Sequence, residues 1–470
     1  MLSLIVVVFV AAVASGVAIN TAFGFDESVY AVLSRHWVSG TPASGWGLHR
    51  PPALSIVGIL PSLISSPPEW AFRTIGVAFG AGTVVATYWL GRTAFGTAAG
   101  ILAAVAVASS AQVQLESGVF LTDVPSTCLL LVITTLLVGV IASGSQLKRR
   151  LLWVMPLAAL AFYLRYGALL ALVSLAVGFA AVWLPRPAEL RAAAAAVAAF
   201  LVLLVPHMVF ATTELGSPWA IVSGAGAAGA HGPSGIPIAS YAAWFAWRPM
   251  GPIGAALALI GGVTIVATAA RLIRSRGWRA ASVRDRAQCA IGIAAGLQLA
   301  VLGSVIHPEP RYVLFPMILL TVAGAEVVAR AVRTRTAAIG AAAVAAAALA
   351  LGTWGSLSEL RQRAAYWDWT RDAARYIASR TDGDCSVLTA DVPIVSWYSG
   401  CQAFGYPSSP DPDPLPAMMG RQLFLVVRED GLFQPAADLM GEQYLSKARD
   451  EVRFPNGFGR LAARVFTLAN

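Results

Sequence analysis

The sequence predicts a mainly α protein: a polytopic transmembrane helical bundle of about 11 spans, followed by a small C-terminal α/β domain. Of the 470 residues, 57% are hydrophobic and only 12% are charged, with a mean hydropathy of +0.69. Soluble domains carry roughly a quarter charged residues. The apolar runs are close to the ~20 residues that cross a bilayer, and short basic clusters separate them.

The first apolar run, 2–20, is interpreted as a retained first span. A cleaved signal peptide is the alternative, but the run lacks a basic leading region and a small-x-small cleavage site. The run 51–66, "PPALSIVGILPSLISS", is short and interrupted by proline, which favours an interfacial helix over a twelfth span. The eleven spans are expected near residues 2–20, 70–90, 97–114, 124–143, 150–163, 167–184, 193–211, 241–270, 288–306, 312–330 and 336–355.

The basic residues between the runs predict the orientation. Cytoplasmic loops of membrane proteins are enriched in Lys and Arg. With the N-terminus in the cytoplasm, the cytoplasmic loops would be "GRTAFG", "QLKRR", "LPRPAELR", "RLIRSRGWRAASVRDR" and "RAVRTRT". An odd number of spans then places the C-terminal domain outside. We therefore expect a multi-pass plasma membrane protein with an extracytoplasmic C-terminal domain.

The composition changes near residue 358, which divides the chain into a membrane domain, 1–357, and an α/β domain, 358–470. In the second domain "YWDWTRDAARYIASR" has helical spacing, and "SSPDPDPLP" is expected to be irregular. Short strands are expected at "CSVLTAD", "PIVSWYS" and "QLFLVVRED".

The four cysteines are too few for a disulfide framework. Cys128 and Cys289 lie in apolar runs and are interpreted as packing residues. Cys385 and Cys401 lie in the polar domain and could pair if that domain is in an oxidising compartment. The sequence leaves both the paired and the reduced state open.

Polar residues gather in the loops predicted to face outward. Charged side chains at membrane depth are energetically costly, so their presence at the ends of the spans indicates a structural or functional role. Asp26 and Asp123 each have a structural alternative as helix N-caps, with Pro125 in the first turn after Asp123. Arg311 could instead be an interfacial side chain that reaches toward water. The candidate site residues among them are Asp26, Glu27, His49, Arg50, Glu116, Asp123, Arg165, His307, Glu309, Arg311 and Tyr312.

Such a set suits sugar transfer from a lipid-linked phosphate. A carboxylate can deprotonate an acceptor as a general base, and Arg can bind a phosphate and stabilise the charge that develops on it. The sequence has no Gly-rich nucleotide loop, which argues against a soluble nucleotide-sugar donor or an ATP-driven pump. The net charge of +9 is scattered rather than gathered in one patch, so no nucleic acid partner is expected.

Four motifs in order resemble the GT-C glycosyltransferases, in particular the protein O-mannosyltransferase and aminoarabinose-transferase branch. They are "FGFDESVYAVLSRHWVSG", "HRPPALSIVG", "FLTDVPSTCLLL" and "HPEPRYVLFPMILLTVAGA". In the second motif Arg50 replaces the commoner Lys. The tail "DCSVLTADVPIVSWYSG" is also similar to extracytoplasmic domains of related members. The resemblance implies a GT-C fold and a polyprenyl- or dolichyl-phosphate sugar donor.

The resemblance also implies roles for single residues. Asp26 would be the catalytic base of an inverting displacement, assisted by Glu27, and Asp123 would contact acceptor, donor sugar or metal. Arg50, Arg311 and Arg165 would bind the donor phosphate beside Tyr312, with Glu116, His49, His307 and Glu309 in support. Many members need no metal, so no cofactor is expected; the alternative is a divalent ion held by Asp26, Glu116 and Asp123.

The acceptor stays open among lipid, glycan and protein, although the chain lacks the large lumenal insert of the eukaryotic protein mannosyltransferases. Besides the donor and the acceptor, we expect membrane lipids as partners. The alternative function is a transporter or flippase of a lipid-linked or amphipathic substrate, which would place ionisable residues near mid-membrane. A non-catalytic partner in envelope assembly is a third hypothesis.

Overall fold

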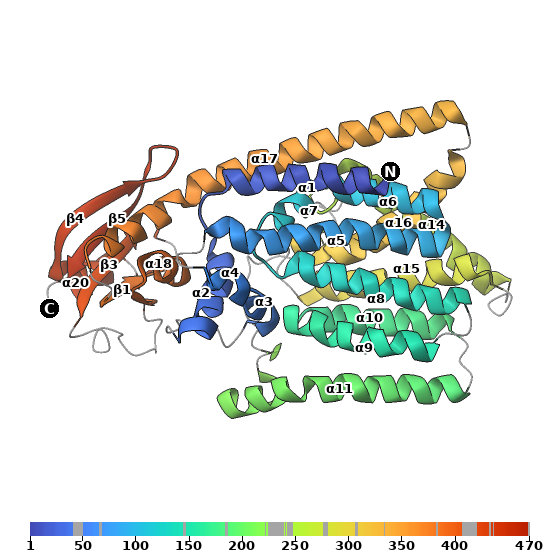
Figure 1. Ribbon diagram of the computed structural model, residues 1–470, viewed down its shortest axis with the longest axis horizontal. Helices are drawn as coiled ribbons and strands as arrows, with labels where there is room; N and C mark the ends of the chain where they lie inside the picture. The colour runs from blue at the N-terminus through green and yellow to red at the C-terminus, as the bar shows by residue number, and fades with distance from the viewer. Residues whose placement is uncertain are drawn as a thin grey trace. The chain divides into compact units, whose positions relative to one another are not determined.

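The computed structural model consists of a helical bundle and a mixed α/β part (Figure 1). Contacts between Cα atoms divide the chain into two compact units. The bundle unit contains Met1–Gly16, His49–Ala53 and Arg73–Leu357, and the mixed unit contains Val17–Leu48, Leu54–Phe72 and Ser358–Asn470. The structure describes residues 1–40, 50–64, 68–143, 147–183, 187–220, 222–223, 239, 241, 248–275, 281–305, 309–332, 334–381, 384–406, 421–431, 434–435 and 437–468.

Each of the eleven predicted spans contains a helix. Within the bundle unit α14 packs on α16, α10 on α15, α9 on both α8 and α11, and α6 on α16. The helices are α1 (Leu2–Ile19), α5 (Glu69–Phe95), α6 (Thr97–Ala108), α7 (Ala111–Ser117), α8 (Asp123–Ser143), α9 (Leu147–Leu164), α10 (Ala168–Val182), α11 (Pro187–Leu215), α14 (Gly251–Arg274), α15 (Val283–Val305), η2 (Pro310–Val313), α16 (Leu314–Ala331) and α17 (Arg335–Ala378).

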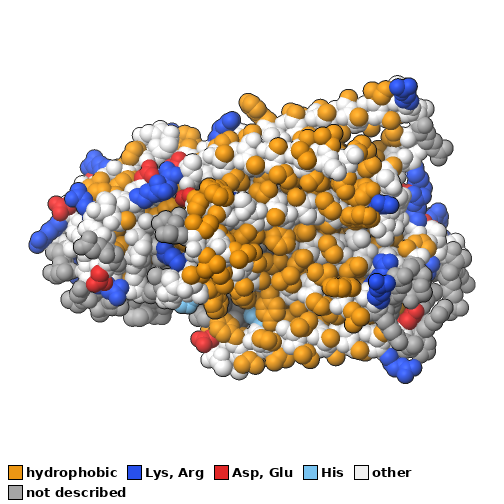
Figure 2. Space-filling model, viewed as in Figure 1, with side chains coloured by type: hydrophobic (Ala, Val, Ile, Leu, Met, Phe, Trp, Pro, Cys, Tyr) orange, Lys and Arg blue, Asp and Glu red, His pale blue; other side chains and the backbone are white. Residues whose placement is uncertain are grey.

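The surface of the bundle is apolar, as a bilayer requires. Figure 2 shows hydrophobic side chains spread over the face formed by α1, α5, α8, α9, α10 and α11. Large residues such as Trp153, Val202 and Leu351 are more than half exposed. Among the described residues, eight helices are long and apolar enough to span a membrane, or nine if a bent pair counts as one span. The chain is thus an integral membrane protein, while the count of eleven spans stays a prediction.

Arg side chains gather at one end of the bundle. Arg92 lies in the last turn of α5, and Arg271 and Arg274 lie in the last turn of α14. Arg284 near the start of α15 donates to the Phe95 carbonyl oxygen at 3.4 Å and pairs with the buried Glu326 at 2.8 Å. Residues of two loops predicted to be cytoplasmic, "GRTAFG" and "RLIRSRGWRAASVRDR", are therefore in contact at this end.

Three boundaries differ from the prediction. The span expected at 97–114 is broken at Ser109, where α6 and α7 meet at 69°; Ser110 caps α7 by accepting a hydrogen bond from the Val113 N–H at 3.1 Å. The helix expected at 241–270 begins only at Gly251. The predicted helices 336–355 and 366–380 are one continuous 44-residue helix, α17, because no residue that breaks a helix separates them.

Three short helices near the N-terminus complete the fold. In the mixed unit α2 (Phe25–Ser39) ends at Gly40, which adopts a left-handed conformation with φ of 68° as expected of a glycine C-cap. α2 packs against α4 (Ile59–Ser62). In place of the single interfacial helix expected at 51–66, the structure has two short helices, α3 (Pro52–Val57) and α4. They have six and four residues, so neither is long enough to span a membrane.

The C-terminal part of the mixed unit is a five-stranded mixed sheet in the order β2-β1-β3-β5-β4. β1 is parallel to both β2 and β3, and β5 is antiparallel to β3 and β4. The outer strand β4 carries exposed charged residues, which protect a sheet edge from further pairing. The elements are β1 (Cys385–Thr389), α18 (Val392–Ser399), β2 (Gln402–Phe404), β3 (Gln422–Arg428), α20 (Ala437–Gln443), η3 (Leu445–Lys447), β4 (Ala448–Pro455) and β5 (Leu461–Leu468).

The strands predicted at "CSVLTAD" and "QLFLVVRED" are confirmed as β1 and β3, but the strand predicted at "PIVSWYS" is wrong. That segment is helix α18. Pro393 lies in its first turn and Gly400, with φ of 74°, ends it. Proline near the start and glycine just past the end are typical of helices, and these signals override the β-branched composition. The loop "SSPDPDPLP" lies outside the described residues.

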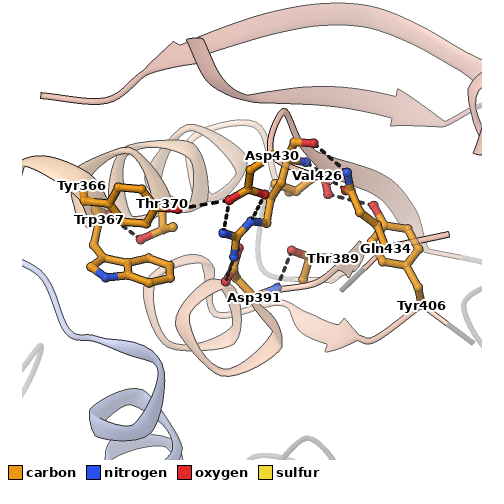
Figure 3. A network of polar contacts seen from close by, with 10 residues as sticks. Tyr366, Trp367, Thr370, Thr389, Asp391, Tyr406, Val426, Asp430 and Gln434 are labelled. Carbon is orange, nitrogen blue, oxygen red and sulfur yellow. Dashed lines mark hydrogen bonds and ion pairs between the residues drawn. The ribbon is translucent and has the colours of Figure 1, made fainter. Parts of the chain in front are cut away.

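A buried ion pair and a disulfide hold this part together. Arg428 at the end of β3 donates to Asp391 at 3.1 Å and, through Nε, to Asp430 at 2.9 Å (Figure 3). Arg428 and Asp391 are each less than 5% exposed. Cys385 and Cys401, which the sequence left open, form a disulfide. This bond ties the start of β1 to the residue just before β2.

Candidate active site

The two adjacent acids of the first loop differ in their surroundings. α2 begins at Phe25 with Gly24 as its N-cap, so Asp26 and Glu27 both lie in the first turn. Glu27 is 3% exposed, and its Oε2 atom accepts a hydrogen bond from the Gly24 N–H at 3.0 Å. Glu27 thus satisfies an N–H group that a helix start leaves unpaired. Asp26 is half-buried, and the N-cap role that the sequence offered for it belongs to Gly24.

In the bundle unit Asp123 is paired with Arg165. Asp123 is 5% exposed and is the first residue of α8, while Arg165 follows directly after α9. Nη1 of Arg165 donates a hydrogen bond to Oδ1 of Asp123. A buried carboxylate needs such a partner. The alternative of Asp123 as an N-cap is not observed, because the helix begins at Asp123 itself.

Two guanidinium groups approach one tyrosine ring. Cζ of Arg165 lies 4.8 Å from the ring centroid of Tyr312, and Cζ of Arg311 lies 5.6 Å from it. Cations within about 6 Å of an aromatic face are attracted to it. Tyr312 and Arg311 lie in η2, which packs against α7 and α15. Arg165, Arg311 and Tyr312 are all predicted to bind the donor phosphate. They therefore lie together beside Asp123, although Arg165 and Arg311 are 146 positions apart in the chain.

We call Asp123, Arg165, Arg311 and Tyr312 the cluster. The backbone of Arg50 is hydrogen-bonded to the residue next to Arg165. The hydroxyl of Tyr166 donates to the carbonyl oxygen of Arg50 at 3.3 Å. The Tyr166 ring is buried, with its centroid 5.1 Å from the ring of His207 on α11 and 5.3 Å from that of Phe162 on α9. This aromatic packing fixes the turn that carries Arg165.

The supporting residues are placed in part. Glu116 on α7 is 2% exposed, and its Oε1 accepts from Nε2 of Gln112 at 2.7 Å. The backbone N–H of Glu309 donates to the hydroxyl of Tyr241 at 3.4 Å. His49 and His307 lie outside the described residues.

Metal binding was an alternative for Asp26, Glu116 and Asp123. Asp26 belongs to the mixed unit, and the other two belong to the bundle unit. Among the residues that the structure describes, His, Cys, Asp and Glu side chains form no group of three that could hold a metal ion. The expectation of no cofactor and the alternative of a divalent ion at these carboxylates both stay predictions.

Two polar residues of the bundle unit are not among the residues predicted from the sequence. Arg73, on α5, is fully buried, although in the sequence it is only an isolated cation. A charge inside an apolar run is the signal that could have found it, because such residues are rarely tolerated without a function or a partner. Tyr241 had no comparable signal, since its contact with Glu309 depends on the fold.

An apolar groove of about 420 Å³ lies among α8, α9, α10 and α11. Its wall on α10 begins at Leu169, four residues after Arg165. Aliphatic and aromatic side chains line it throughout. They include Ile133, Leu137, Leu172, Trp183 and Phe200.

Comparison with known proteins supports the fold over the whole chain. The structure of ArnT from Cupriavidus metallidurans bound to undecaprenyl phosphate matches with a TM-score of 0.67 and 13% identity, covering 99% of this chain and 97% of that one. The apo oligosaccharyltransferase of Archaeoglobus fulgidus matches with a TM-score of 0.62 and 12% identity, covering 91% and 70%. The archaeal oligosaccharyltransferase AglB from the same organism, in complex with an inhibitory peptide and a dolichol-phosphate, has a TM-score of 0.58 and 11% identity, covering 85% and 64%.

The sequence comparison is more local. The family model described as dolichyl-phosphate-mannose-protein mannosyltransferase matches residues 49–210. No curated protein sequence matches the chain. The protein is therefore an integral membrane protein with the GT-C fold that the sequence predicted. The matched segment 49–210 contains Arg50 as well as Asp123 and Arg165 of the cluster.

Proposed function

We propose that this protein is an integral membrane glycosyltransferase that moves a sugar from a polyprenyl- or dolichyl-phosphate donor to an acceptor on the outer face of the membrane. The observation that carries the proposal is the meeting of Arg165 and Arg311 at Tyr312, beside the buried Asp123. Two cations close to one point suit a phosphate. The ligands bound in two of the structural neighbours, undecaprenyl phosphate and dolichol-phosphate, are lipid-linked phosphates of the same class.

The apolar groove supports a donor that arrives in the membrane. An isoprenoid chain needs an apolar surface, and the groove offers one among four helices. Because its wall starts one helical turn after Arg165, a chain in the groove would have its phosphate near the cations. This arrangement favours a lipid-linked donor over a water-soluble one.

The proposed reaction is a single inverting displacement. Asp26 takes the proton from the acceptor, the acceptor atom attacks the anomeric carbon, and the bond between that carbon and the phosphate oxygen breaks. The electron pair leaves on the polyprenyl phosphate, whose added charge Arg165, Arg311 and Arg50 stabilise. Glu27 is less suited to the base role, because its carboxylate closes the start of α2.

Two observations support an extracytoplasmic site. The Cys385–Cys401 disulfide is of a kind that persists in oxidising compartments, and it lies in the same compact unit as Asp26. The basic residues that gather at one end of the bundle follow the enrichment of cytoplasmic loops in Lys and Arg.

The test compares the wild type with Asp26→Asn in a strain that lacks the gene, by profiling its glycans and lipids. The wild type should restore one missing decoration. Asp26→Asn should slow its formation at least ~100-fold at equal protein levels, which is the usual contribution of a general base. Asp384→Asn is the matched control, because that side chain is 81% exposed. A fully active Asp26→Asn would show that Asp26 is not the base.

A transporter or flippase is the second candidate, favoured by the 69° break between α6 and α7. Broken helices at membrane depth are typical of transporters. The two functions differ in their product. A transporter would move the polyprenyl-phosphate sugar with its sugar–phosphate bond intact, whereas the proposed enzyme would release polyprenyl phosphate in the same amount as transferred sugar.

A further inference from the structure

The segment 20–24, which leads into α2 and its acids Asp26 and Glu27, is hydrogen-bonded to residues of the C-terminal domain within the mixed unit. We call this segment the acidic loop. The hydroxyl of Tyr398 accepts a hydrogen bond from the Phe23 N–H at 2.8 Å and donates one to Oε1 of Glu69 at 2.9 Å. The next N–H along the chain, that of Gly24, is the one that Glu27 holds. The N–H groups of Phe23 and Gly24 are therefore both hydrogen-bonded. Glu27 of α2 holds the second, but the first is held by Tyr398 of α18.

Further contacts hold the same segment. Oγ1 of Thr21 donates to Asp368 at 2.8 Å, and Nη1 of Arg371 donates to the Thr21 carbonyl oxygen at 3.0 Å. Phe23 is fully buried, with its ring centroid 5.5 Å from that of Trp397 and 5.7 Å from that of Phe72. The chain that enters α2 is thus bound by residues of α17 and α18.

The other end of α2 is bound to the same helix. Arg35 donates from Nη2 to the Ser396 carbonyl oxygen at 2.9 Å and from Nη1 to the Trp397 carbonyl oxygen at 3.2 Å. Its guanidinium also lies 5.0 Å from the Trp397 ring centroid. Cations near a helix C-terminus stabilise its last carbonyl groups, and the Ser396 carbonyl also accepts from the Gly400 N–H at 3.2 Å. α2 and α18 are thus joined at both ends of α2.

α18 is itself anchored on both sides. Asp391, directly before it, is held by the buried Arg428, and Cys401, two residues after it, forms the disulfide with Cys385. The N–H of Cys401 also donates to Oγ of Ser399 at 3.1 Å. The helix that carries Tyr398 is therefore tied to the sheet at both of its ends.

We propose that Tyr398 is a positioning residue for Asp26: its hydroxyl fixes the backbone at Phe23 and so holds the first turn of α2 in the geometry that proton removal requires. This inference rests on the proposed function. A catalytic group misplaced by about 1 Å can cost ~100-fold in rate. The C-terminal domain would thus act in the reaction through the loop that it holds.

The test uses Tyr398→Phe in the full-length protein, which removes the hydroxyl and keeps the ring. We expect the decoration in the deletion strain to form ~10- to 100-fold more slowly at equal protein levels, with the affinity for undecaprenyl phosphate unchanged within about twofold. Peptides covering residues 19–27 should exchange amide hydrogens faster, while peptides of β1 and β3 keep their protection.

Two further variants separate positioning from a general loss of structure. Tyr406→Phe removes a hydroxyl that donates to the Val426 carbonyl oxygen at 2.8 Å in the same domain, and it should leave the rate unchanged. Glu69→Gln keeps an acceptor for Tyr398 and should retain activity, whereas Glu69→Ala should resemble Tyr398→Phe.

A normal rate for Tyr398→Phe together with an inactive Asp26→Asn would overturn the positioning role and leave the proposed function intact. Equal slowing by Tyr398→Phe and Tyr406→Phe would also overturn it, since the effect would then be general to the domain. A fully active Asp26→Asn would overturn the base assignment, and the positioning role with it.

Discussion

At the scale of single residues, burial separates side chains that the sequence presents as equals. Asp26 and Glu27 are neighbours with the same charge, yet Glu27 is 3% exposed and closes the helix start, whereas Asp26 is half-buried. The sequence preferred Asp26 only through the resemblance to GT-C enzymes. The hydrogen bond to Gly24 gives Glu27 a structural role, and the choice of Asp26 as the base stays a prediction.

Arg165 provides a test of the buried ion pair. Arg165→Ala leaves the Asp123 carboxylate, 5% exposed, without its guanidinium. Removing one partner of a buried pair costs about 3 kcal/mol or more, so we expect the free energy of unfolding to fall by about that amount. The partial exposure of Arg165, 25%, makes the lower end of that range the expected value. Unfolding of the purified protein in detergent micelles measures it.

The control for this change is Arg453→Ala. Arg453 is 70% exposed and pairs with Glu451 on β4, and exposed pairs contribute about 0–1 kcal/mol. A second variant, Asp123→Asn with Arg165→Ala, removes the uncompensated charge and should recover part of the lost stability. Equal stability of Arg165→Ala and Arg453→Ala would contradict the importance of the buried pair.

At the scale of elements, helix ends and close contacts decide what composition leaves open. α18 has a strand-like composition but the proline and glycine of a helix at its ends. The break between α6 and α7 depends on Ser110, whose hydroxyl also donates to the Pro249 carbonyl oxygen at 2.8 Å. At the same point Gly352 of α17 lies so close to the Ser109 carbonyl group that a Cβ atom would collide with it.

The ion network around Arg428 predicts a pH dependence of the C-terminal sheet. Burial raises the pKa of Asp391 from 3.8 to about 6, despite the opposing effect of Arg428, and Asp430 adds to the increase. The folded state keeps this proton up to pH about 6, and the unfolded chain releases it near 3.8. Asp391 therefore stabilises the fold below pH 3.8, and this contribution, ~3 kcal/mol, is lost as pH rises through 6.

Asp391→Asn isolates this effect. The stability of the wild type relative to Asp391→Asn should fall as pH rises from about 4 to 7, because the amide does not ionise. Hydrogen exchange of the β1 and β3 amides in the full-length protein measures the free energy of opening at each pH. Asp384→Asn, at a position 81% exposed, should show no such trend. A constant difference between wild type and Asp391→Asn would contradict the raised pKa.

At the scale of the whole molecule, the proposed orientation predicts opposite accessibility of two surface positions. Arg335, the first residue of α17, lies in a loop that the sequence predicts to be cytoplasmic, and Ser446 lies in η3 of the C-terminal domain. Both residues are exposed. In sealed right-side-out vesicles a membrane-impermeant maleimide should label Ser446→Cys and not Arg335→Cys.

Inside-out vesicles should give the reverse pattern. The native thiols of Cys128 and Cys289 are buried, so the wild type gives the background. Labelling of both variants from the same side would contradict the predicted topology, and labelling of Arg335→Cys alone from outside would invert it.

The sequence by itself determined the class of the fold and the residues worth testing. Apolar runs and basic loops are local properties of the chain, so the helices appear where hydropathy places them, and short motifs pointed to the GT-C fold. Local patterns cannot show which segments meet. The pairing of Asp123 with Arg165, the approach of Arg165 to Tyr312 and the bonds of Tyr398 join positions far apart in the sequence. Only the tertiary structure decided these contacts, because they depend on how helices and sheet pack against one another.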